Sequence, residues 1–187
     1  MIGYGAQKKY FLEALHAGSL AHAYILVGPD GVGKRTLAME VAAELMQVPV
    51  EKVTVNPNFL YVRRLEDEKT GKLKKELSVA QARELRARLA GSAWGSGYRV
   101  VVIDEVELLN AEAANALLKL LEEPPKDTVF FLLTNNDVQL LPTIISRGVR
   151  IVLAPLGDSE LGAALETTVP DVNQRPCTPI AGTPSIL

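Results

Sequence analysis

The sequence contains a single cysteine and no excess of positive charge. Cys177 is the only cysteine among 187 residues, so an internal disulfide framework is excluded, and one cysteine cannot by itself make a structural zinc site. The net charge of −2 and the isoelectric point near 5.8 exclude a protein that binds nucleic acid through an overall basic field. Any DNA contact must therefore come from a local patch or from partner subunits.

Long apolar runs are also missing. No segment approaches the roughly 20 apolar residues that a helix needs to cross a bilayer. Residues 1–15 lack the cationic and then apolar order of a signal peptide. We therefore expect a cytoplasmic protein with no membrane partner. The content of 48% hydrophobic and 22% charged residues is typical of a globular chain, which at this length can bury a sizeable core.

Apolar runs alternate with helical patterns along the chain. We expect strands at residues 23–27, 59–62, 100–103, 129–133 and 149–153. We expect helices at about residues 7–17, 34–46, 79–89, 111–122 and 139–145. Four of the strands are nearly continuous apolar runs, as expected when helices cover both faces of a sheet. The alternation predicts an α/β fold with a five-stranded parallel sheet flanked by helices.

Helix start and stop signals support these boundaries. Ser78 followed by Gln81 is the pattern of a capping box, and Asn110 is a favourable N-cap for the helix at 111–122. That helix must end before Pro124, which cannot continue it. The charged stretch at 63–76 is expected to form a solvated hairpin or loop.

A glycine-rich turn follows the first expected strand and opens the second expected helix. Its residues are Gly28, Pro29, Asp30, Gly31, Val32, Gly33 and Lys34. Glycines let successive backbone N–H groups turn toward phosphate oxygens, and the helix N-terminus adds a favourable dipole. Lys34 supplies a point charge for the β- and γ-phosphates. The spacing, the lysine and the strand–helix context together predict a P-loop that binds ATP or ADP.

The residue after this lysine departs from the P-loop pattern. A P-loop has Ser or Thr there because the hydroxyl ligates magnesium, but this sequence has Arg35, with Thr36 one residue later. A helix turns about 100° per residue, so Thr36 is expected to point away from the ligand. Either the loop shifts and Thr36 substitutes, or magnesium binding is impaired and the site binds nucleotide without hydrolysing it efficiently. We favour the second interpretation.

Polar residues directly follow the expected strands at 100–103 and 129–133. Asp104 and Glu105 follow the strand at 100–103, where the aspartate is placed to hold hydrated magnesium and the glutamate to polarise the attacking water. A plain acidic pair leading into a helix is the alternative. Thr134 and Asn135 close the following strand, where they either contact the γ-phosphate or simply end the strand in a turn.

Arg147 lies in a Ser-Arg-Gly triplet just before the last expected strand. An arginine at this position is placed to reach a phosphate bound by a neighbouring subunit and to act there as a finger in trans. On its own, such a triplet is more often a surface turn. Its role therefore depends on the motifs that accompany it.

Several segments together resemble the bacterial clamp-loader family of AAA+ proteins. They are HAYILVGPDGVGKRTLA, RVVVIDEVELLNAEAANALLKLLEEPP, VFFLLTNN and LLPTIISR. The run NALLKLLEEPP after an acidic pair is particularly specific to clamp loaders among P-loop proteins. The resemblance covers about residues 3–156. Within the family, the delta-prime subunits look closer than the gamma/tau motor subunits, because delta-prime-like sequences tolerate an arginine after the P-loop lysine.

The resemblance implies a five-stranded parallel AAA+ core, a small helical lid and a collar domain that holds a pentamer together. Relatives open the sliding clamp of DNA polymerase III and place it on primed DNA, using ATP. In that picture delta-prime is a comparatively rigid stator, and its arginine, here Arg147, is offered to the ATP site of the adjacent motor subunit. The implied partners are the other clamp-loader subunits and, through them, the clamp and DNA.

Two departures from the family pattern qualify this picture. Residues 47–57 hold no cysteine where relatives usually carry a zinc module, so we expect no zinc. We also expect residues 1–156 to form the nucleotide-binding core and 157–187 to form a partial lid helix, at 158–166, followed by an irregular tail from 167. A full lid and collar do not fit in that length, so the lid is expected to be largely missing.

Two other functions compete with a stator. One is an active motor ATPase of the gamma/tau type, which would use Lys34, Asp104 and Glu105 to hydrolyse Mg-ATP; Arg35 argues against it. The other is a small-molecule kinase, which needs an arginine-rich lid over its acceptor site that the residues after 150 do not supply.

Overall fold

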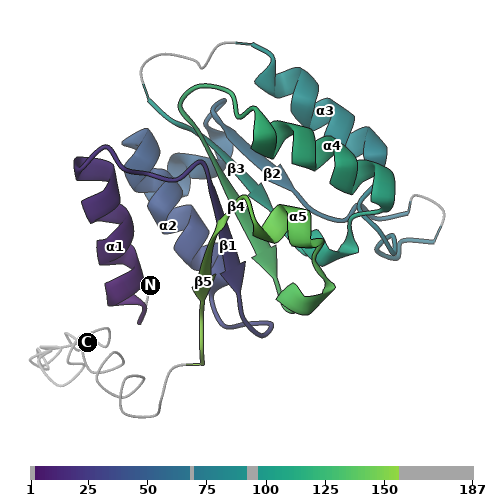
Figure 1. The fold of residues 1–187 in the computed structure, drawn as a ribbon, viewed down its shortest axis with the longest axis horizontal. Coiled ribbons are helices and arrows are strands. Elements are labelled where there is room, and N and C mark those ends of the chain that lie inside the picture. The colour runs from purple at the N-terminus through teal and green to yellow at the C-terminus, as the bar shows by residue number, and fades with distance from the viewer. Residues whose placement is uncertain (1–2, 68–69, 92–96, 156–187) are drawn as a thin grey trace, which may run out of the picture.

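The computed structural model describes residues 3–67, 70–91 and 97–155 (Figure 1). These residues form one five-stranded sheet in the order β2-β3-β4-β1-β5, and every neighbouring pair of strands is parallel. The sheet is flanked by helices on both faces, which confirms the predicted α/β architecture. The predicted partial lid and tail at 157–187 lie outside the described residues.

The elements follow one another in simple alternation. The strands are β1 (Ala23–Val27), β2 (Phe59–Val62), β3 (Arg99–Ile103), β4 (Thr128–Thr134) and β5 (Val149–Val152). The α-helices are α1 (Gly5–His16), α2 (Lys34–Met46), α3 (Val79–Leu89), α4 (Ala111–Glu122) and α5 (Pro142–Ile145). In the described ranges, three short 3-10 helices connect them: η1 (Val50–Val55), η2 (Val106–Leu108) and η3 (Asp137–Gln139).

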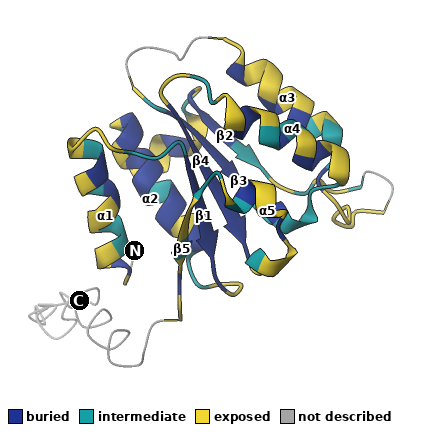
Figure 2. Ribbon diagram, viewed as in Figure 1, coloured by how far each residue is buried: buried dark blue, intermediate teal, exposed yellow. Residues whose placement is uncertain are grey.

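The two faces of the sheet carry two separate apolar cores, because successive side chains of a strand point to opposite faces. In β1, Tyr24 and Leu26 pack with α1 and α2, whereas Ala23, Ile25 and Val27 pack on the opposite face with α3, α4 and α5. The central strands β1, β3 and β4 are buried along their whole length (Figure 2). Their continuous apolar runs are explained by this double cover.

Aromatic rings fill the core between the sheet and α1. Phe131 of β4 is fully buried, with its ring centroid 5.6 Å from that of Phe11 and 5.8 Å from that of Tyr24. Tyr10 extends the cluster to the surface, where its side chain is 44% exposed. The cluster joins α1 to β1, which leads into the P-loop, and to β4, which ends at Thr134.

The predicted helix signals act as expected at two places. Gln81 Oε1 accepts the backbone N–H of Ser78 at 3.1 Å within a capping box. Asn110 Oδ1 accepts the backbone N–H of Ala113 at 2.9 Å, and α4 ends at Glu122 before the prolines. In the charged stretch at 63–76, which was predicted to form a hairpin or loop, an antiparallel bridge joins Glu66 and Leu73.

The predicted helix at 139–145 was wrong in its first half. The chain forms the 3-10 helix η3 and then the four-residue α5, which begins at Pro142. Proline has no N–H to donate and restricts the residue before it to extended backbone, and Leu141 accordingly has φ −61° and ψ 132°. A single helix therefore cannot run through this segment.

The two edges of the sheet are β2 and β5. The residues of β5 are mostly exposed, with Val149 at 37% and Val152 at 55%. Arg150 on this strand pairs with Asp137 at 2.6 Å. Across the described segments, no helix is both long enough and apolar enough to span a bilayer.

Candidate functional site: a P-loop whose acids are already paired

The P-loop connects the carboxyl end of β1 to the first turn of α2, as predicted. A β-carbon at Gly28 would lie 2.4 Å from the carbonyl oxygen of Leu153, so no larger residue fits without a shift of the backbone. Gly31 and Gly33 have φ of +76° and +100°, a region that glycine adopts at little cost. These three glycines give the loop the tight course that brings backbone N–H groups toward a bound phosphate.

Lys34 lies at the start of α2 with only 7% of its surface exposed. Its ammonium donates to the carbonyl oxygens of Gly28 at 2.6 Å and Pro29 at 2.9 Å, and to Oδ1 of Asn135 at 2.7 Å. Burial lowers the pKa of Lys34, and the nearby carboxylates, Asp104 among them, oppose that shift. The lysine is thus held by the loop itself and by the end of β4.

Arg35 lies directly after this lysine, on the exposed side of the first turn of α2. Its guanidinium carbon lies 4.8 Å from the centroid of the Tyr61 ring, within the range of a cation–π contact. The Tyr61 hydroxyl donates to Oδ2 of Asp104 at 2.7 Å. Burial, and then this hydrogen bond to a carboxylate, raise the pKa of Tyr61. Thr36 is exposed on α2.

Asp104 therefore has both carboxylate oxygens engaged within the chain. Oδ2 accepts from Tyr61, and Oδ1 accepts the backbone N–H of Glu105 at 3.1 Å. Magnesium needs several oxygen ligands in octahedral geometry, yet the residue after the P-loop lysine is a cation. Arg35, a cation in place of a ligand oxygen, does not fit a magnesium site.

Glu105 is paired as well. The Arg64 guanidinium donates from Nε to Oε2 at 2.6 Å and from Nη2 to Oε1 at 2.5 Å. Such a two-point arginine–carboxylate pair is among the stronger ion pairs in proteins. Glu105 also has a positive φ of 51°, which a residue with a side chain adopts at some cost. The carboxylate that would polarise water in an active ATPase is therefore occupied by an arginine.

The end of β4 contributes one of its two predicted residues to the P-loop lysine. The side chain of Asn135 accepts from Lys34, whereas the Thr134 side chain is buried and accepts the backbone N–H of Asn136 at 3.1 Å. Thr134 reaches the loop through its backbone, since its carbonyl accepts the Gly28 N–H at 3.2 Å. The Asn135 backbone N–H donates to Oε1 of Glu107 at 3.1 Å.

Arg147 follows α5 and lies at the surface with its side chain 33% exposed. Its guanidinium donates to the carbonyl of Thr143 at 2.9 Å and forms an ion pair with Glu122 of α4 at 2.7 Å. These contacts belong to the helical face of α4 and α5, not to the P-loop of the same chain.

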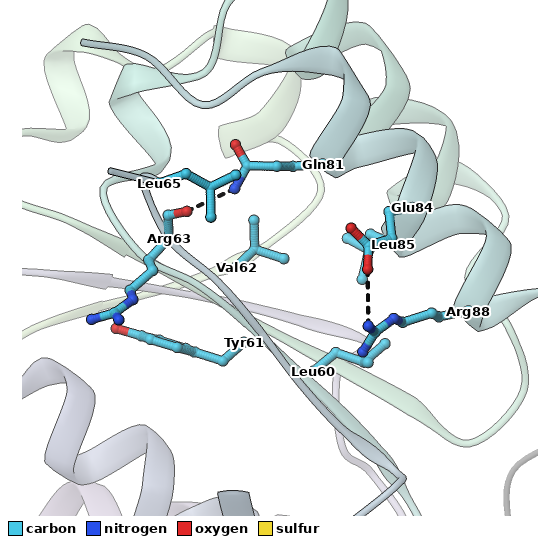
Figure 3. Close-up of a pocket in the computed structure, with 9 residues that line it drawn as sticks. All are labelled: Leu60, Tyr61, Val62, Arg63, Leu65, Gln81, Glu84, Leu85 and Arg88. Atoms are coloured by element: carbon cyan, nitrogen blue, oxygen red, sulfur yellow. Dashed lines mark hydrogen bonds and ion pairs between the residues drawn. The ribbon is translucent and has the colours of Figure 1, made fainter. Parts of the chain in front are cut away.

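A pocket of about 230 Å³ lies beside the site, between β2 and α3 (Figure 3). Tyr61 and Arg63 line it from the end of β2, and the Gln81 side chain donates to the Arg63 carbonyl at 2.7 Å. Glu84 and Arg88 form an ion pair along α3 at its other wall. Tyr61 thus belongs both to this pocket and to the contacts around Asp104.

Three residues of the site were missed in the sequence: Tyr61, Arg64 and Glu107. Tyr61 and Arg64 lie at the carboxyl end of β2, which pairs in parallel with β3, the strand that ends before Asp104. The carboxyl ends of neighbouring parallel strands meet at one edge of a sheet. Tyr61 and the polar residues that follow 59–62 could therefore have been assigned to the site once β2 and β3 were placed side by side.

A family model described as DNA polymerase III, delta subunit, matches residues 4–157. The chain belongs to this family. Among curated relatives, it is 38% identical over 144 residues to DNA polymerase III subunit delta' of Pseudomonas aeruginosa, and the match covers 70% of this chain and 42% of that protein. It is 35% identical over 147 residues to DNA polymerase III subunit gamma/tau of Mycobacterium bovis, covering 72% of this chain and 24% of that protein.

Solved structures with the same fold include a DNA polymerase III gamma subunit-related protein of Thermotoga maritima. It has a TM-score of 0.63 and 24% identity, and the match covers 82% of this chain and 46% of that one. A variant of RuvB from the same organism has a TM-score of 0.60 and 24% identity, covering 88% of this chain and 50% of that one. The chain spans half or less of the length of all these relatives. Their fold is the predicted AAA+ P-loop core.

Proposed function

We propose that this chain is a clamp-loader subunit of the delta-prime kind, which helps to place the sliding clamp of the replicative DNA polymerase on primed DNA. The observation that carries the proposal is the family match over residues 4–157. The proposed partners are the other clamp-loader subunits and, through them, the clamp and DNA. Within that assembly the chain acts as a stator that offers Arg147 to the ATP site of an adjacent motor subunit.

The contacts of the chain's own P-loop support a stator rather than a motor. Arg35 replaces the hydroxyl that would ligate magnesium, Tyr61 bonds Asp104, and Arg64 pairs with Glu105. Each group that a hydrolytic site would use for the metal or for water is either replaced or bonded within the chain. Arg147 is also paired within the chain, with Glu122, and its side chain is 33% exposed, so a neighbouring subunit would have to draw it from that ion pair.

The proposal is tested by assembling motor subunits of the same organism with and without this chain and measuring clamp loading on primed DNA. We expect loading to depend on the chain. A loader that reaches full activity without it would contradict the proposal. The assay is run with the whole gene product as well, so that segments outside residues 1–187 contribute if they exist.

A motor ATPase of the gamma/tau type is the second candidate. The P-loop lysine, the strand-end acids and the 35% identity to a gamma/tau subunit favour it. It requires magnesium-dependent ATP turnover by the isolated chain, abolished by Lys34→Ala. Under the stator proposal we expect turnover at the background rate for both the wild-type chain and the Lys34→Ala variant, measured as phosphate release.

A further inference from the structure

We propose that the P-loop of this chain binds a nucleoside polyphosphate as the metal-free anion, with Arg35 supplying the positive charge that magnesium supplies in a hydrolytic P-loop. This inference rests on the proposed function, in which the P-loop of this chain does not hydrolyse ATP. It names the ligand of that P-loop. It predicts that a divalent cation is dispensable for binding.

The position of Arg35 is the first step. In a hydrolytic P-loop the magnesium lies between the hydroxyl after the lysine and the aspartate at the strand end. Here the guanidinium of Arg35 stacks on Tyr61, and the hydroxyl of Tyr61 bonds Asp104. Contacts between side chains therefore connect residue 35 with Asp104, the two positions that hold magnesium in a hydrolytic P-loop. The positive charge at this place belongs to the side chain of Arg35.

The charges of the site are the second step. A bare polyphosphate would be repelled by Asp104 and Glu105 if both were free. Tyr61 donates a hydrogen bond to Asp104, and Arg64 neutralises Glu105 by a two-point ion pair. Lys34 and Arg35 then provide two positive charges at the start of α2. Arginine stays protonated at any physiological pH, and its planar fork of donors matches phosphate oxygens.

The backbone is the third step. Gly31 and Gly33 keep the tight turn of a phosphate-binding loop, and α2 is a full helix of 13 residues with the loop at its N-terminus. Lys34 is held by three oxygens, those of Gly28, Pro29 and Asn135, in the described arrangement. A phosphate takes over these bonds by offering the ammonium charged acceptors. The anion-binding part of the P-loop is thus kept, although the metal-binding part is replaced.

The experiment is calorimetric titration of the chain with ATP and with ADP, once in EDTA and once in excess magnesium. We expect the wild-type chain to bind at least as tightly in EDTA as in magnesium. In Arg35→Thr, we expect the Kd in EDTA to rise about tenfold, because the positive charge of one guanidinium beside the P-loop is lost. Magnesium should then restore part of the affinity, since the variant regains the hydroxyl that a metal site uses.

Two further variants make the result specific. Arg150→Thr removes the same charge from β5, where Arg150 pairs with Asp137 at 2.6 Å, and should leave both titrations unchanged. Tyr61→Phe keeps the ring under Arg35 but loses the bond to Asp104. It should bind more weakly in EDTA, because the freed Asp104 carboxylate repels the bare polyphosphate, and it should gain a response to magnesium.

Three results would overturn the inference. They are a wild-type chain that needs magnesium to bind, a chain that binds neither ATP nor ADP, and equal effects of Arg35→Thr and Arg150→Thr. The clamp-loading assay is independent of these titrations. A chain that supports loading but binds no nucleotide would sink this inference alone, whereas a chain that binds metal-free nucleotide but is dispensable for loading would sink the proposed function alone.

Discussion

In an assembled clamp loader, Arg147→Ala in this chain is expected to slow ATP turnover at the adjoining motor site by about a thousandfold. That is the lower range of what an arginine finger contributes to phosphoryl transfer, because its charge stabilises the transition state rather than the bound nucleotide. ATP affinity at the same site should change far less. Single-turnover hydrolysis by the assembled complex, with nucleotide binding measured separately, checks both expectations.

Two control variants separate a finger from a structural arginine. Glu122→Gln removes the ion-pair partner of Arg147 but leaves the guanidinium in place, so turnover should be retained. Exposed ion pairs contribute only about 0.2–1 kcal/mol to stability, so the variant should also fold. Arg150→Ala removes a second exposed arginine, which pairs with Asp137 instead. If Glu122→Gln slows turnover as much as Arg147→Ala does, the ion pair and not the finger explains the effect.

Phe131→Ala is expected to lower the free energy of unfolding by about 4 kcal/mol, which is typical for truncating a buried phenylalanine. The ring is fully buried and contacts Phe11 and Tyr24, so its loss leaves a cavity between the sheet and α1. In a domain of this size, the corresponding fall in Tm is roughly 10 °C. Urea denaturation followed by circular dichroism measures the change.

Tyr10→Ala is the matched control for this core substitution. Tyr10 belongs to the same aromatic cluster, but its side chain is 44% exposed, so much of its surface already meets water. We expect a loss of less than about 1.5 kcal/mol, in proportion to the smaller buried area. Equal losses for both variants would mean that burial in this cluster does not set the stability of the domain.

The strands and most helices were predictable from the sequence, because most strands of this fold are runs of buried apolar residues. The strand at 23–27 was placed without error, and the strand at 129–133 was extended by one residue at each end. Those added residues are Thr128 and Thr134, polar residues that nonetheless pair within the sheet and are buried. The predicted helix was wrong near Pro142. The apolar pattern there suits a helix, but the proline restricts the backbone of the residue before it.

The site was predictable only in part. The P-loop, Asp104 and Asn135 were found through motifs that follow one another along the chain. The partners of the acids were missed, because Tyr61 and Arg64 precede Asp104 and Glu105 by about forty residues. Tyr61 meets Asp104, and Arg64 meets Glu105, only through the pairing of β2 with β3. A motif shows which residue types a reaction needs. It does not show which other residues of the fold form hydrogen bonds or ion pairs with them. For this chain, those neighbours are the main argument against hydrolysis at its own site.

The exposed strand β5 has a consequence for handling the isolated chain. Within the described part of the chain, β5 is an edge strand, so one row of its backbone donors and acceptors has no strand beside it there, and Val149 and Val152 are exposed. Such a border is a template on which a second chain can add a strand, and charged side chains oppose that addition. Arg150 is the single charge on β5, and Asp137 neutralises it. Self-association at high protein concentration would therefore start at this edge strand. Measurements on the isolated chain should accordingly be made at low protein concentration.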